Sequence, residues 1–202
     1  DVYKRQVRGL PMDQEQRFAL SGLFATMGFG LPAGMAGALS VPDSQAWSFS
    51  GDGGFAMVAP DIITEARYGL PVINVIFSNQ RFGFIYREQV DTKQHLYGVD
   101  LTDADWAKVA DGLGGIGFTV QNNQEVETVF DQIKALQAKG NKRPIVVNAV
   151  IKNDDPIGTA YMPLDPELYG QAEVDAYAKA NHIDIKEQPS LGALLRAQGD
   201  QL

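Results

Sequence analysis

The stretch "QAWSFSGDGGFAMVAPDIITEARYGLPVINVIFSN" (residues 45–79) decides the fold. It begins with a short apolar segment, 45–50, and ends with a β-branched apolar segment, 71–78, and both patterns predict buried strands. Between them Pro60 is placed to open a helix and Gly69 to end it. A strand–helix–strand unit of this length predicts two parallel strands joined by a right-handed crossover.

The same alternation continues along the chain. We expect helices over 102–115 and 123–140 and strands over 117–120 and 144–151. Upstream, residues 23–41 start as a glycine-rich loop and become a helix of small residues with Pro32 in its first turn. The pattern predicts the α/β class, with an open, mainly parallel sheet that carries helices on both faces.

The two ends of the chain differ from this pattern. Residues 1–10 show no periodicity, and we interpret them as a non-native or unstructured leader. Residues 11–160 form the predicted α/β domain. Residues 161–202 are interpreted as a C-terminal tail with short helices near 171–181 and 190–198.

Composition excludes several classes of function. A net charge of -8 disfavours a nucleic-acid binder, which needs a basic face. The absence of cysteine excludes disulfides and thiolate metal sites, and two histidines make a histidine-rich metal centre improbable. No apolar run is long enough to span a membrane and no signal peptide is visible, so we expect a cytoplasmic protein.

Two oxygen-bearing side chains follow the two strands of the deciding stretch. Asp52 comes directly after one strand and Asn79 after the other, and in open α/β sheets ligands bind at the carboxyl ends of strands. Such oxygens suit Mg²⁺ or Ca²⁺. Arg67 is the only basic residue from 18 to 80, so a phosphate here needs backbone N–H groups of 51–54 and a bridging cation. Alone, the "GDGG" of 51–54 also fits a tight turn, and Asn79 also fits a cap.

These residues carry a resemblance. "GDGG" and Asn79, with residues 53–78 between Asp52 and Asn79, resemble the thiamine diphosphate fingerprint of the decarboxylase and carboligase superfamily, although Ser78 replaces an asparagine common there. "LFATMGFGLP", "LPVINVIFSN", "FGFIYREQ" and "KVADG" are further similar to the phosphate-dependent pyruvate oxidase family over most of 18–151. The similarity covers the last of that family's three domains and implies a thiamine diphosphate-binding fold.

The resemblance implies roles for individual residues. Asp52, Asn79 and the backbone carbonyl of Arg81 would ligate Mg²⁺. Met27 would support the bent cofactor, and the carbonyl of Ala25 would accept a hydrogen bond from its aminopyrimidine. The full cofactor set is Ala25, Met27, Gly51, Asp52, Gly53, Gly54, Asn79, Phe82, Gly83, Phe84 and Ile85, and the catalytic set is Glu88, Phe84 and Gln89. On residue type alone, Met27 also fits a core position, Glu88 a solvated helix and His95 an ordinary loop.

The implied activity is conversion of pyruvate, phosphate and O₂ to acetyl phosphate, CO₂ and hydrogen peroxide, with FAD bound mainly by a domain absent from this chain. Its implied setting is a homotetramer, in which a neighbouring subunit supplies a glutamate, so we expect the 202-residue chain to be inactive alone. Two alternatives stay open. One is an acetolactate synthase-like or other 2-keto acid decarboxylase domain, and the other is a non-catalytic phosphate-ligand-binding or assembly module.

Overall fold

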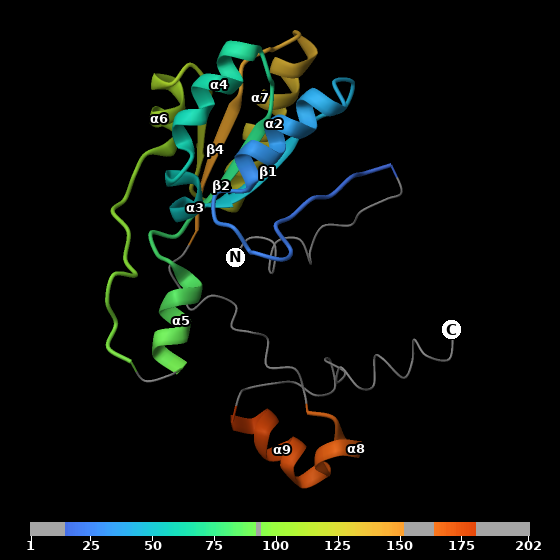
Figure 1. Cartoon of the computed structure of the whole chain (residues 1–202), viewed down its shortest axis with the longest axis vertical. Coiled ribbons are helices and arrows are strands. Elements are labelled where there is room, and N and C mark those ends of the chain that lie inside the picture. The colour runs from blue at the N-terminus through green and yellow to red at the C-terminus, as the bar shows by residue number, and fades with distance from the viewer. Residues whose placement is uncertain (1–14, 92–93, 152–163, 181–202) are drawn as a thin grey trace. The chain divides into compact units, whose positions relative to one another are not determined.

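The computed structural model describes residues 15–91, 94–151 and 164–180. A four-stranded, all-parallel sheet lies at its centre, in the order β1-β2-β4-β3 (Figure 1). Its strands are β1 (Trp47–Gly51), β2 (Ile73–Ser78), β3 (Ile116–Val120) and β4 (Ile145–Val150). All four lie where the sequence predicts strands, and the predicted α/β class is confirmed.

Helices follow the strands as the crossover pattern requires. They are α2 (Gly30–Ser40), α3 (Asp52–Ala56), the 3-10 turn η2 (Ala59–Asp61), α4 (Ile62–Tyr68), α5 (Gly83–Asp91), α6 (Trp106–Gly112) and α7 (Asn123–Ala138). Pro60 opens η2 rather than α4 itself, and Gly69 ends α4 as predicted. Helix α6 begins later than the predicted 102, because the Asp105 side chain caps it by accepting the Lys108 N–H.

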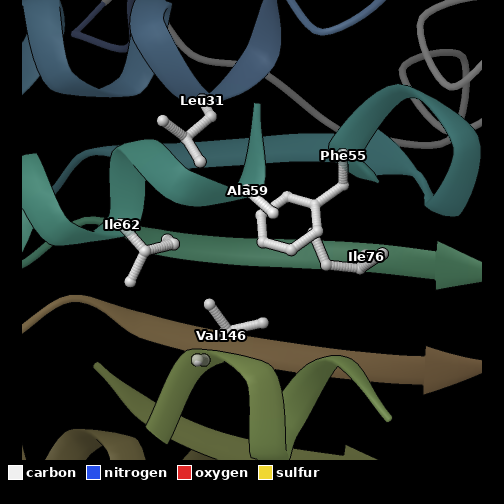
Figure 2. Packing of buried hydrophobic residues seen from close by; sticks show 7 residues of the cluster. Leu31, Phe55, Ala59, Ile62, Ile76 and Val146 are labelled. Atoms are coloured by element: carbon white, nitrogen blue, oxygen red, sulfur yellow. The ribbon is translucent and has the colours of Figure 1, made fainter. Parts of the chain in front are cut away.

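The core has one cluster on each face of the sheet. Helices α2, α3, α4 and α6 contribute to the first cluster, whose side chains meet Ile76 of β2 and Val146 of β4 (Figure 2). Its fully buried members include Leu31, Phe55 and Ile62. Helix α7 covers the opposite face, where Val129 and Ile133 pack on alternate residues of β2, β3 and β4. Helices therefore lie on both faces, as expected.

One buried polar group interrupts the first face. Glu65 of α4 is 0% exposed and accepts a hydrogen bond from Asn74 Nδ2 on β2, at 2.9 Å. Asn74 Oδ1 in turn accepts the Ser48 hydroxyl of β1, at 2.6 Å. Glu65 Oε1 has no partner in the described part of the chain. Burial raises the pKa of Glu65 to about 8, against the smaller lowering effect of Asn74.

The chain divides into two compact units, residues 1–156 and 157–202. The described part of the second unit holds α8 (Pro166–Tyr169) and α9 (Gln171–Ala180). Helix α9 matches the helix expected near 171–181, whereas α8 was not expected. The helix expected near 190–198 and the leader 1–10 lie outside the described residues, so the predicted domain limits stay predictions. None of the described helices has the length and apolar character that a membrane crossing requires.

Candidate cofactor and metal site

The ends of β1 and β2 meet at one edge of the sheet. The strands are direct neighbours, and Gly51, the last residue of β1, pairs in register with Phe77 of β2. Asp52 therefore leaves the sheet beside the residues that follow β2. Its Oδ2 accepts a hydrogen bond of 2.6 Å from the Gln80 N–H, and its Oδ1 accepts the Gly53 N–H at 2.9 Å.

The Asp52 carboxyl is buried and has no basic side chain as a partner in the described part of the chain. It is 5% exposed, and burial raises the pKa of this carboxyl, while the backbone hydrogen bonds from Gln80 and Gly53 lower it less. Within the described ranges, no ion pair joins Asp52 to a basic side chain. A buried anion held only by neutral donors is a group that a divalent cation would stabilise.

Residues 79–82 form a tight turn beside Asp52, and we call this segment the cation turn. Asn79 Oδ1 accepts the Arg81 N–H at 3.2 Å, as an Asx turn does, and a carbonyl oxygen keeps a second lone pair. Gln80 has a φ of 59°, a left-handed conformation that costs a residue with a side chain about 1 kcal/mol or more. The N–H of this residue donates to Asp52 Oδ2.

The Arg81 carbonyl accepts neither of the two hydrogen bonds of the antiparallel bridge in which Arg81 lies. Arg81 faces Asp100 in an isolated antiparallel bridge, whose two hydrogen bonds run from Phe82 N–H to the Val99 carbonyl and from Leu101 N–H to the Gln80 carbonyl. Arg81 is thus in the non-hydrogen-bonded pair. The three oxygens expected to ligate Mg²⁺, on Asp52, Asn79 and Arg81, come from two adjacent strand ends.

The donor set fits a hard cation and not a softer metal. Among residues 15–91, 94–151 and 164–180, no group of three His, Cys, Asp or Glu side chains could hold a metal ion. A site here would consist of one carboxylate and neutral oxygens. Mg²⁺ accepts such a set because it keeps waters and takes further oxygens from a bound phosphate.

Two glycine segments lie against each other at this edge. A Cβ placed on Gly28, which has a φ of 81°, would lie 3.3 Å from the Gly54 carbonyl oxygen. A Cβ on Gly53 would collide with the Phe82 ring and come within 3.1 Å of Leu101. The close approach of loop 25–30, segment 51–54 and the cation turn therefore depends on glycine at both positions.

Loop 25–30 places Ala25 and Met27 at the border of the site. Ala25 has a φ of 49°, and its turn is held by Ser21, whose carbonyl accepts the Ala25 N–H at 2.9 Å and whose hydroxyl accepts the Thr26 N–H at 3.1 Å. Backbone strain of this kind gathers at ligand sites. Met27 is 44% exposed, so it is not the core residue that its type alone allows.

The residues predicted for the reaction chamber lie on α5, which starts directly after the cation turn. Phe84 is half-buried, Ile85 and Glu88 are exposed, and their spacing puts all three near one face of the helix. Gln89 is engaged differently, because its side-chain amide donates to the Tyr97 carbonyl at 3.1 Å and accepts the Tyr97 N–H at 3.0 Å. His95 is exposed, as an ordinary loop residue would be.

Sequence reasoning missed three contributors to this edge. Gln80 belongs to the cation turn and bonds Asp52, whereas Tyr86 and Asp100 contact Arg81 of that turn. The left-handed Gln80 has no sequence signal, since glutamine is not a residue favoured there. Asp100 gave no signal either, because its partner lies 19 residues away in the chain.

Comparisons with known proteins agree with this geometry. Residues 3–149 match the family described as the thiamine pyrophosphate enzyme, C-terminal TPP binding domain. The chain is 37% identical to a pyruvate oxidase of Lactiplantibacillus plantarum over 178 residues, which are 88% of this chain and 29% of that protein. It is 30% identical to an acetolactate synthase of Mycobacterium leprae over 140 residues, 66% of this chain and 22% of that protein.

A solved structure shares the fold. The thiamine diphosphate-dependent 4-hydroxybenzoylformate decarboxylase of Rhodococcus jostii RHA1 superposes with a TM-score of 0.58 at 25% identity. The superposition covers 64% of this chain and 24% of the decarboxylase. The chain thus spans less than a third of the length of each of these relatives.

Proposed function

Because the chain belongs to the thiamine pyrophosphate enzyme family, as its C-terminal TPP-binding domain, we propose that Mg²⁺ at the Asp52 edge fixes the diphosphate of thiamine diphosphate. The observation that carries this proposal is the buried Asp52 carboxylate, which has only neutral partners in the described chain and is joined to the residue after Asn79. Thiamine diphosphate, when bound, supplies the electron sink for decarboxylation of a 2-keto acid.

The residues of this chain bind and orient the group. Asp52, Asn79 and the Arg81 carbonyl would hold the metal ion, and the backbone of Gly51, Gly53 and Gly54 would contact the phosphate oxygens. The Gly53 N–H already donates to Asp52, so it fixes the carboxylate that faces the ion. The exposed Met27 and the strained Ala25 offer a hydrophobic support and a carbonyl acceptor on the other side.

We further propose that the enzyme is a pyruvate oxidase. The support is the 37% identity, which extends over 88% of this chain. Pyruvate and phosphate would then be substrates, and FAD would bind mainly to parts of the protein outside these residues. Residues Phe84, Ile85 and Glu88 of α5 would face the substrate. A homotetramer, a cytoplasmic location and inactivity of the 202-residue chain alone belong to the same proposal.

A second candidate within the family is an acetolactate synthase-like enzyme. The 30% identity to such a synthase favours it, although that match covers less of this chain. The metal and diphosphate roles would be unchanged, and only the acceptor would differ. A longer protein that contains this sequence would be assayed for acetyl phosphate and for acetolactate. Acetolactate without acetyl phosphate would reject the oxidase assignment.

Calorimetry tests the cofactor assignment directly. The 202-residue chain is titrated with thiamine diphosphate in the presence and absence of Mg²⁺, and we expect heat of binding only with the metal ion. Asp52→Ala should abolish this binding while far-UV circular dichroism stays native. Binding that needs no metal, or equal affinity in Asp52→Ala, would instead favour a non-catalytic phosphate-ligand-binding module.

A further inference from the structure

A segment that is distant in sequence forms backbone hydrogen bonds with the cation turn. Residues 97–101, which we call the strap, contribute the Val99 carbonyl as acceptor for the Phe82 N–H and the Leu101 N–H as donor to the Gln80 carbonyl, both at 2.8 Å. Val99 is 3% exposed, although the chain on either side of it is exposed. The buried Val99 therefore anchors the strap on the cation turn.

The strap also binds the one basic side chain of the cation turn. Arg81 Nε and Nη2 each lie 2.7 Å from Asp100 Oδ1. The same guanidinium lies over the Tyr86 ring of α5, 4.2 Å from its centroid. The Arg81 side chain is 22% exposed and that of Asp100 is 70% exposed, so the ion pair is partly desolvated on the arginine side only, and stacking on Tyr86 restricts the guanidinium.

The strap is fastened at a second point, near the far end of α5. There the Gln89 amide makes its two hydrogen bonds to the backbone of Tyr97. Residues 94–101 thus run back alongside α5 to the cation turn (Figure 1). The strap is therefore held at two places, the cation turn and the far end of α5.

The strap reaches the other half of the site as well. A Cβ on Gly53 would lie 3.1 Å from Leu101 Cδ1, which places this strap residue against the segment that carries Asp52. Leu101 is also the residue whose N–H bonds Gln80. The strap therefore contacts both the Asp52 segment and the cation turn.

We propose that Asp100 is a positioning residue for the metal site, because its ion pair holds the Arg81 guanidinium at Tyr86 and the strap on the cation turn. The inference rests on the proposed function, since it concerns the same divalent ion. Arg81 pairs with Asp100 and, within the described chain, not with Asp52. A guanidinium released from Asp100 would compete with the divalent ion for the buried carboxylate, and the turn that supplies the Arg81 carbonyl would lose an anchor.

The test uses Asp100→Asn in the 202-residue chain, with Asp131→Asn as the matched control. Asp131 forms a similar ion pair with Lys134, at 3.2 Å on the exposed side of α7. Two quantities are measured: amide hydrogen exchange of Phe82 and Leu101 without ligand, and the dissociation constant for inorganic pyrophosphate in the presence of Mg²⁺. We expect about 2- to 5-fold changes in both for Asp100→Asn, the range for an ion pair with an exposed partner, and none for Asp131→Asn.

The double variant Arg81→Met/Asp100→Asn separates the two effects. It keeps the backbone carbonyl of residue 81 but has no guanidinium to compete, so we expect it to recover most of the pyrophosphate affinity while the amides still exchange fast. If the wild-type chain shows no Mg²⁺-dependent binding, the proposed function fails and this inference with it. If the wild-type chain binds but Asp100→Asn matches it in affinity and exchange, the positioning role alone is wrong.

Discussion

Asp52 and Gln80, 28 residues apart in the chain, are joined by a hydrogen bond of 2.6 Å from the Gln80 N–H to the Asp52 carboxylate. The bond links the residue that follows β1 to the segment that follows β2. Gln80 is in a left-handed conformation, with a φ of 59°, so local backbone strain coincides with the contact to the buried carboxyl. The backbone of residue 80, and not its side chain, makes this contact.

Substitutions of Gln80 test whether the site depends on the backbone of this residue or on its side chain. Gln80→Gly removes the strain of the left-handed conformation and keeps the N–H, so we expect the free energy of unfolding to stay equal or rise by up to about 1 kcal/mol. Gln80→Val, with a β-branched side chain, should lower it by about 1–2 kcal/mol and weaken Mg²⁺-dependent binding of pyrophosphate. Urea unfolding and calorimetry measure both. A clear loss of binding in Gln80→Gly would contradict the backbone role.

Gly51 and Gly53, on either side of Asp52, provide a control variant and a test variant for the packing at this edge. Gly53→Ala puts a methyl group into the Phe82 ring and against Leu101, so we expect a loss of about 1–3 kcal/mol in the free energy of unfolding and weaker metal-dependent binding. Gly51→Ala meets no protein atom within 4 Å and has an ordinary φ of -76°, so it should change the free energy of unfolding little. Thermal unfolding of the two variants is the measurement. Equal stabilities would show that the close packing at Gly53 is not required.

The Asn79 side chain offers a third test at the metal site. Asn79→Ala removes the proposed oxygen ligand and the acceptor of the Arg81 N–H, so we expect the pyrophosphate dissociation constant in Mg²⁺ to rise about 10-fold or more. Asn79→Asp keeps an oxygen at that place and should retain most of the affinity. Isothermal titration of both variants decides this. If alanine is tolerated as well as aspartate, Asn79 only forms the turn.

The sequence was sufficient for the fold because each strand has a local signature. Continuous β-branched runs mark β2 and β4, and the proline and glycine at positions 60 and 69 bound the helical segment between β1 and β2. Boundaries differ where a side chain outside the pattern acts, as with the Asp105 cap of α6. Helix α8 was missed although Asp165 and Pro166 are a cap and a first helical residue, because the segment around them is rich in turn formers.

The candidate site was predictable only in part, for a physical reason. The position of Asp52 and Asn79 follows from the rule that parallel strands end at the same edge, which needs no tertiary detail. The strap does not follow from any such rule, since Arg81 and Asp100 meet across a loop with no periodic pattern. Likewise, nothing in the sequence shows that the Gln89 amide binds the backbone of Tyr97.

The buried Glu65 predicts an unusual dependence of stability on pH. Its pKa is about 8 in the folded chain and near 4.5 when exposed, so the folded state retains a proton that the unfolded state releases. The groups that act on Glu65 are Asn74 of β2, which is neutral, and the negative Asp61, which raises the pKa further. The stabilising contribution is therefore complete below pH 4.5 and is lost as the pH rises to about 8, at up to about 1.4 kcal/mol per pH unit.

Glu65→Gln tests this dependence, because glutamine can still accept the hydrogen bond from Asn74 but does not ionise. We expect the free energy of unfolding of the wild-type chain, measured with urea at pH 5, 6.5 and 8, to fall steadily, and that of Glu65→Gln to fall much less. Glu127→Gln, on the exposed side of α7, is the control and should follow the wild type. Parallel pH curves for the wild type and Glu65→Gln would mean that Glu65 is already ionised in the folded protein, with a cation or water at its unpaired Oε1.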